Sequence, residues 1–106
     1  MESRVIFADE ELKKAFENLK IEDERLYKEI EKALNKIKQN AFFGRNVKKD
    51  LIPKELIQKY GIDNLWIYNL RKDWRLIYTI TSNEIEVLAI ILDWMNHKDY
   101  ERLFKF

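Results

Sequence analysis

The hydrophobic repeat of this chain changes once along its length, and that change constrains the fold more than any short motif. Before residue 40, apolar side chains recur every three or four positions, which is typical of amphipathic helices. These side chains are Leu12, Ala15, Phe16, Leu19, Leu26, Ile30, Ala33 and Ile37. After residue 64, apolar and aromatic residues alternate with others or form short runs, which is typical of strands. Helices followed by strands predict an α+β domain.

Capping residues indicate where the helices begin. A short apolar run at residues 5–7 predicts a first strand, and Asp9 and Asp23 are suitable N-cap residues for two helices, the second ending near Asn40. The connection between these helices is short, so they are expected to form an antiparallel hairpin. Pro53 and Gly61 then bound a short predicted helix over residues 54–60.

Three strands and a final helix are predicted in the rest of the chain. The strands cover residues 65–70, 74–81 and 85–92, with a turn at 71–73 and a hairpin turn at 82–83. Residues 87–92 are apolar on both faces, so this strand should be central or covered. Asn96 is a suitable cap for a last short helix. The expected fold is an N-terminal strand and a helical hairpin packed on a mainly antiparallel sheet.

Length and composition exclude several classes of protein. With 106 residues, of which 46% are hydrophobic, the chain is expected to form one domain over residues 1–106. Because it has no cysteine and one histidine, the chain cannot form a disulfide, a thiolate metal site or a histidine-rich metal site, and no cofactor is expected. No apolar run approaches the roughly 20 residues of a membrane span, and the N-terminus lacks a signal-peptide pattern. A cytoplasmic protein without a membrane partner is expected.

The charged residues are distributed unevenly, although the net charge is only +1. Residues 35–75 carry ten Lys or Arg and four Asp or Glu, whereas residues 1–34 and 76–106 have an excess of acidic residues. A basic segment of this kind can concentrate a polyanion at one face of the protein. The alternative is that the acidic segments are simply solvated, Glu-rich helices.

Arg75 is the residue that most suggests a function. It lies in a predicted strand with Trp74 and Leu76, where packing gives no reason for a guanidinium group. Arginine suits bidentate contact with a phosphate and could stabilise the charge of a pentacoordinate phosphorus. The alternative is an ordinary ion pair on a neighbouring strand. Possible partners for that pair are Asp73, Glu84 and Glu86.

Two further candidates, His97 and Tyr100, follow the last predicted strand. Histidine titrates near neutral pH and is a natural general acid or base. Tyrosine can move a proton or stack on an unpaired base. The alternatives are a solvent-facing histidine and a tyrosine that packs the last helix against the sheet.

Basic residues around the predicted sheet are candidates for RNA-backbone contacts. Arg45, Lys48 and Lys49 form the densest cluster, although an ordinary solvated loop would have the same composition. The remaining candidates of this kind are Lys54, Arg71 and Lys98. The aromatic residues of the strands, Trp66, Tyr68 and Trp74, fit a hydrophobic core better than a base-stacking surface.

The chain resembles the RelE/ParE superfamily of type II toxin–antitoxin toxins over nearly its whole length. The segment NLRKDWRLIYTI is similar to the family's turn and arginine-containing strand, and ILDWMNHKDYERLF is similar to its last strand and tail. In the middle, LIPKELIQKYGIDNLWIYNL is similar to the basic loop that leads into the sheet. The RelE-like branch fits best. One departure is that the strand at residues 65–69 has no lysine, whereas well-known RelE enzymes carry lysines there.

The resemblance implies a toxin that is a metal-independent endoribonuclease. Such a toxin cleaves mRNA on the ribosome through attack by a ribose 2′-hydroxyl on the adjacent phosphate, and so inhibits translation. It implies Arg75, His97 and Tyr100 as catalytic residues, and the ribosome, mRNA and a cognate antitoxin as partners. The alternatives are a ParE-like, non-enzymatic inhibitor of DNA gyrase, or a domain of the same fold that only binds a partner.

Overall fold

A computed structural model describes residues 2–105 of the chain. Its sheet has five strands in the order β1-β5-β4-β3-β2. These strands are β1 (Arg4–Phe7), β2 (Arg45–Asn46), β3 (Trp66–Asn69), β4 (Arg75–Ser82) and β5 (Val87–Met95). Strand β1 pairs with β5 in parallel, and the other pairs are antiparallel. The predicted α+β fold with a mainly antiparallel sheet is confirmed, and β5 is an inner strand as its apolar composition predicts.

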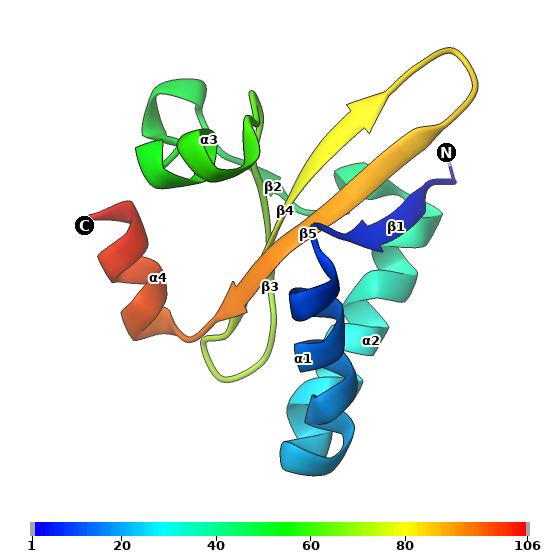
Figure 1. Cartoon of the computed structure of the whole chain (residues 1–106), viewed down its shortest axis with the longest axis vertical. Coiled ribbons are helices and arrows are strands. Elements are labelled where there is room, and N and C mark those ends of the chain that lie inside the picture. The colour runs from blue at the N-terminus through cyan, green and yellow to red at the C-terminus, as the bar shows by residue number, and fades with distance from the viewer. Residues whose placement is uncertain (1, 106) are drawn as a thin grey trace.

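The helical hairpin consists of α1 (Glu10–Glu22) and α2 (Glu24–Gln39). Asp9 and Asp23 cap these helices as predicted, because their carboxylates accept hydrogen bonds from the backbone N–H of Leu12 at 2.7 Å and of Leu26 at 3.1 Å. The hairpin covers one face of the sheet (Figure 1). Its apolar stripe, which includes Ile30, packs against that face in a first hydrophobic core.

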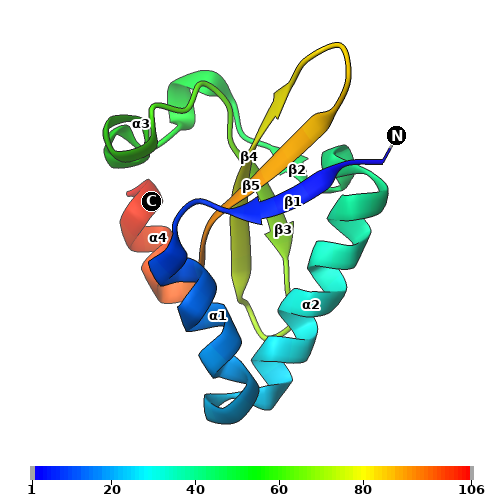
Figure 2. The same ribbon diagram turned by 45° about the vertical axis from the view of Figure 1, so that its right-hand side comes forward.

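The opposite face of the sheet is covered by α3 (Lys54–Tyr60), α4 (His97–Phe104) and a single turn of 3-10 helix, η2 (Lys49–Leu51). Another single turn, η1 (Ala41–Phe43), follows α2, and its Ala41 is buried in the first core. Figure 2 shows α3 and α4 on the side of the sheet away from α2. A second hydrophobic core lies beneath α3 and α4, and it includes Leu65, Ile77 and Tyr100. The sheet therefore separates two cores. No helix in the described part of the chain is long and apolar enough to cross a membrane.

Several predicted bounds of the strands differ from the structure, most of all in β5, which was predicted over residues 85–92 and covers Val87–Met95. Strand β5 begins at Val87 rather than at residue 85, because the side chain of Asn83 accepts hydrogen bonds from the backbone N–H of Ile85 and Glu86 and holds them in the turn. The segment expected to be a basic loop contains β2, which pairs with β3 through Arg45 and Asn46. A strand of two residues has no alternating pattern that a sequence could reveal.

Candidate functional site

Gly44 and Tyr78 together place the edge strand β2. A side chain at Gly44 would bring a Cβ atom to 2.6 Å from the Tyr78 Oη and 2.8 Å from the carbonyl oxygen of Ile67, so only glycine fits. The Tyr78 hydroxyl accepts a hydrogen bond from the Gly44 N–H at 3.0 Å and donates one to the carbonyl of Ala41 at 2.7 Å. This anchor sets Arg45 opposite Ile67, on the same side of the sheet as the second core.

Arg75 is the first residue of β4, paired with Asn69 and Met95 on the neighbouring strands. Its Nη1 donates to the carbonyl of Trp74 at 3.3 Å. Within residues 2–105, its Nε is buried without a hydrogen-bond partner, and no carboxylate lies within ion-pair distance of its guanidinium. The alternative of an ion pair is therefore wrong. A buried donor without a partner is costly, and a catalytic or binding role is one explanation for keeping it.

Tyr100 joins the two arginines. The Arg45 Nη2 donates to the Tyr100 hydroxyl oxygen at 3.3 Å, and the Arg75 guanidinium carbon lies 5.3 Å from the centre of the Tyr100 ring. The second contact is a cation–π interaction, which favours a cation over the face of the ring. Tyr100 itself is only 6% exposed, because it also belongs to the second core. The predicted packing role of Tyr100 is thus confirmed, and the structure adds contacts with both guanidinium groups.

His97 lies next to this cluster in the first turn of α4. Its ring is stacked on that of Tyr100 with 6.4 Å between centroids. Its Nε2 lies 2.6 Å from the Glu101 Oε1, one helical turn away. Sequence reasoning did not select Glu101, although a histidine and a glutamate four residues apart in a predicted helix indicate such a pair. A carboxylate this close to one imidazole nitrogen favours one orientation of the ring and leaves the other nitrogen open to exchange a proton.

Of the other basic candidates, only Lys48 joins the cluster. It lines a pocket of about 310 Å³ together with Arg45, Tyr100 and Phe104. The side chains of Lys49, Lys54 and Lys98 are exposed on η2, α3 and α4, and within residues 2–105 they form no hydrogen bond or ion pair. Arg71 lies on the hairpin side of the sheet, where its Nε is 3.4 Å from the Glu29 Oε1.

The aromatic strand residues behave as the sequence predicts. Trp66, Tyr68 and Trp74 are partly buried and pack against the first core. Across residues 2–105, no group of three or more histidine, cysteine, aspartate or glutamate side chains is placed to hold a metal ion. The site consists of a phenol in contact with two guanidinium groups, and an imidazole and a carboxylate lie beside it. Fixed positive charge of this kind suits an anion such as a phosphate.

The protein is thus a small α+β domain with a basic, aromatic site beneath its last helix. Residues 8–93 match the family model described as the ParE toxin of the type II toxin–antitoxin system parDE, so the chain belongs to this family. It is a toxin of a type II system, and an antitoxin is the partner that this family implies. His97 and Tyr100 lie beyond the matched residues. No curated protein and no solved structure matches the chain.

Proposed function

We propose that this toxin is a metal-independent endoribonuclease that cleaves mRNA on the ribosome. The observation that carries the proposal is the position of Arg45 and Arg75, whose guanidinium groups both contact Tyr100. Two guanidinium groups held a short distance apart suit the equatorial oxygens of a phosphodiester, where negative charge increases in the transition state. The absence of a carboxylate partner for Arg75 among the described residues leaves its charge available for that role.

In the proposed cleavage step, one residue accepts a proton and another residue donates one. The ribose 2′-oxygen attacks the adjacent phosphorus, the bond to the 5′-oxygen breaks, and the products are a 2′,3′-cyclic phosphate and a 5′-hydroxyl. His97 takes the proton of the 2′-hydroxyl on its Nδ1, because the Glu101 carboxylate lies 2.6 Å from its Nε2 and occupies that side of the ring. The hydroxyl of Tyr100, polarised by the Arg45 guanidinium, donates a proton to the departing 5′-oxygen. Arg75 stabilises the pentacoordinate phosphorus.

Primer extension on an mRNA translated by purified ribosomes tests this proposal. The wild-type toxin should produce new 5′ ends, and Arg75→Ala should lower the cleavage rate about 10²- to 10³-fold, the usual effect of removing one preorganised charge or donor. Arg102→Ala is the matched control, because Arg102 lies on α4 but pairs with Asp99 at 3.6 Å, away from Tyr100. Equal cleavage by wild type and Arg75→Ala would refute the proposal.

A second function is inhibition of DNA gyrase without catalysis. The family match favours it, because the matching model describes ParE toxins. The sequence of β3, which has no lysine, also favours it. A supercoiling assay with purified gyrase separates the two functions. Loss of supercoiling, with mRNA left intact, would support gyrase as the target, whereas unaffected supercoiling at micromolar toxin would exclude it.

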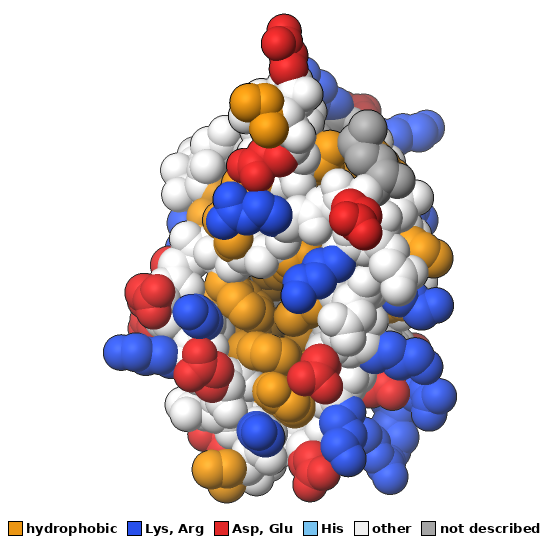
Figure 3. Space-filling view, turned by 90° about the vertical axis from the view of Figure 1, so that its right-hand side faces the viewer, with side chains coloured by type: hydrophobic (Ala, Val, Ile, Leu, Met, Phe, Trp, Pro, Cys, Tyr) orange, Lys and Arg blue, Asp and Glu red, His pale blue; other side chains and the backbone are white. Residues whose placement is uncertain are grey.

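The antitoxin is proposed to cover the face formed by β1 and the helical hairpin. Figure 3 shows hydrophobic side chains gathered in a strip down this face, with charged side chains on both sides. The half-buried apolar residues of β1 and α1 include Val5, Phe7, Leu12 and Leu19. Strand β1 is also an edge of the sheet, so its outer backbone groups are open to pairing. An amphipathic partner segment fits both features.

A further inference from the structure

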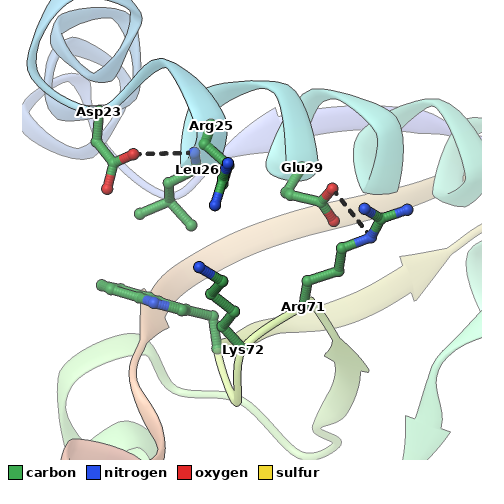
Figure 4. Close-up of a pocket in the computed structure, with 7 residues that line it drawn as sticks. Asp23, Arg25, Leu26, Glu29, Arg71 and Lys72 are labelled. Atoms are coloured by element: carbon green, nitrogen blue, oxygen red, sulfur yellow. Dashed lines mark hydrogen bonds and ion pairs between the residues drawn. The ribbon is translucent and has the colours of Figure 1, made fainter.

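A separate pocket lies on the hairpin side of the sheet, between the start of α2 and the turn that joins β3 to β4. Its volume is about 640 Å³, twice that of the pocket beside Tyr100. Figure 4 shows its labelled residues, which come from α2 and from the turn. The lining residues are Asp23, Arg25, Leu26, Glu29, Arg71, Lys72 and Trp74. Nothing in the proposed cleavage step uses this pocket.

Two of its three cations have no acidic partner. Arg71 pairs with Glu29, and Asp23 accepts the capping hydrogen bond from the Leu26 N–H. Arg25 and Lys72 form no ion pair with any carboxylate in residues 2–105. Their head groups nevertheless point toward each other across the pocket (Figure 4). Two like charges facing one space raise the local concentration of anions and favour an anionic ligand between them.

The backbone of the turn holds Lys72 in this position. Lys72 and Asp73 both have left-handed backbone angles, with φ of 56° and 62°. The turn is closed by hydrogen bonds from the Leu70 N–H to the Trp74 carbonyl at 2.8 Å and from the Trp74 N–H to the Arg71 carbonyl at 3.3 Å. Left-handed geometry at two non-glycine residues is unfavourable, and such strain is found preferentially at binding sites. The lysine is therefore presented on a defined turn.

The rest of the wall is apolar and aromatic. Trp74 is half-buried against the first core and also lines the pocket, so its indole ring is both fixed and accessible. We propose that this pocket binds one nucleotide unit of a single-stranded RNA, with its phosphate between Arg25 and Lys72 and its base against Trp74. Cations combined with an accessible aromatic ring are the recurring means of binding single-stranded nucleic acid. An acidic peptide would use the cations but has no flat group for the indole.

The pocket and the Arg75 site meet at the beginning of β4. Trp74 and Arg75 are consecutive residues, and the Arg75 Nη1 donates to the carbonyl of Trp74. A single strand that passes around this end of the sheet would contact both. The proposal rests on the residues of the pocket and does not require the chain to cleave RNA, so binding and cleavage are tested separately.

Fluorescence anisotropy with a short, fluorescein-labelled oligoadenylate tests the proposal on the full chain. The double variant Arg25→Ala, Lys72→Ala should raise the Kd for RNA about tenfold or more. A plot of the logarithm of the binding constant against the logarithm of the salt concentration should also become less steep, by about 0.7 for each phosphate that the variant no longer neutralises. Trp74→Leu should raise the Kd about fivefold or more, whereas Trp74→Phe should retain most of the affinity. Lys28→Ala is the matched control, because Lys28 lies on α2 and pairs with Glu24 at 3.0 Å.

Unchanged oligoadenylate affinity in the double variant would overturn the proposal, and so would a loss of binding to polyglutamate without a loss of binding to RNA. Arg25 and Lys72 are exposed, so their removal leaves the core intact, and this variant reports on binding even if Trp74→Leu unfolds. Arg75→Ala distinguishes this proposal from the cleavage proposal. It should lower the cleavage rate about 10²- to 10³-fold, while Trp74→Leu should still weaken RNA binding when it is combined with Arg75→Ala.

Discussion

At the scale of single residues, Tyr100 connects the packing of the molecule to its candidate chemistry. The ring fills the second core, its oxygen accepts from Arg45, and its face lies beside Arg75. The side chain therefore fixes the geometry of both guanidinium groups and is also the proposed proton donor. The two roles depend on different parts of the side chain, because packing needs the ring whereas proton donation needs the hydroxyl.

The variant Tyr100→Phe separates the two roles. It keeps the ring, so the free energy of unfolding should fall by only about 1 kcal/mol, the usual net value of one hydrogen bond. Cleavage should fall about 10²- to 10⁴-fold, because the proton donor is gone. Urea unfolding and primer extension measure the two effects. Full cleavage by a stable Tyr100→Phe protein would show that the tyrosine contributes packing alone.

Tyr78 gives a prediction for the pH dependence of stability. Burial raises the pKa of its hydroxyl to about 12, above the ordinary value of 10. The unfolded chain therefore loses this proton at lower pH than the folded chain, so the stabilisation is complete below pH 10 and is lost as the pH rises toward 12. Urea unfolding of the wild type should show this decline, which should be smaller in Tyr78→Phe. An equal decline in both proteins would contradict the assignment.

At the scale of elements, the turn between β3 and β4 places a residue of each proposed site. Arg75 follows this turn on one face of the sheet, and Lys72 lies within it beside the pocket of α2. Lys72 and Asp73 both have positive φ, as the two central residues of a type I′ hairpin turn do. Glycine is the preferred second residue of that turn, so the natural sequence is not optimal for stability here.

Asp73→Gly should therefore raise the free energy of unfolding by about 1 kcal/mol, because glycine adopts positive φ without strain. Thermal or urea unfolding measures the change. Asp50→Gly is a control, since Asp50 has no positive φ and lies in the 3-10 turn η2. A lower stability of Asp73→Gly would mean that the aspartate side chain contributes more than the strain costs.

The elements also show how far sequence alone predicts this protein. The caps at Asp9, Asp23 and Asn96 and the left-handed Gly61 were predictable, because each depends on a local interaction. Strand β2 was not, since it exists only through pairing with β3 and the close approach of Gly44 to Tyr78. For the same reason, Arg75 and Tyr100 were predictable as candidates, whereas no local pattern indicates that Arg45 contacts Tyr100.

At the scale of the whole molecule, the sheet separates two surfaces with different proposed partners. The α4 side carries the guanidinium cluster for the toxin's target, and the face of β1 and the hairpin carries the hydrophobic strip for the antitoxin (Figure 3). Two separate surfaces allow a variant to lose one partner and keep the other.

Leu19→Glu tests this division. It introduces a charge into the half-buried apolar strip on α1, so the antitoxin should no longer be retained in a pull-down, whereas growth inhibition should persist. Ile85→Glu is the matched control, because Ile85 is 93% exposed at the tip of the β4–β5 hairpin. Retention of the antitoxin by Leu19→Glu would place the interface elsewhere.

Growth of cells after induction of toxin variants without antitoxin tests whether the cluster around Tyr100 is the functional site, because growth arrest does not depend on which target is correct. The double variant Arg45→Ala, Arg75→Ala should allow normal growth and should still bind the antitoxin, which shows that it folds. Arg102→Ala, a change of the same type on α4, should remain toxic. If the double variant arrests growth as strongly as the wild type, the cluster around Tyr100 is not the functional site.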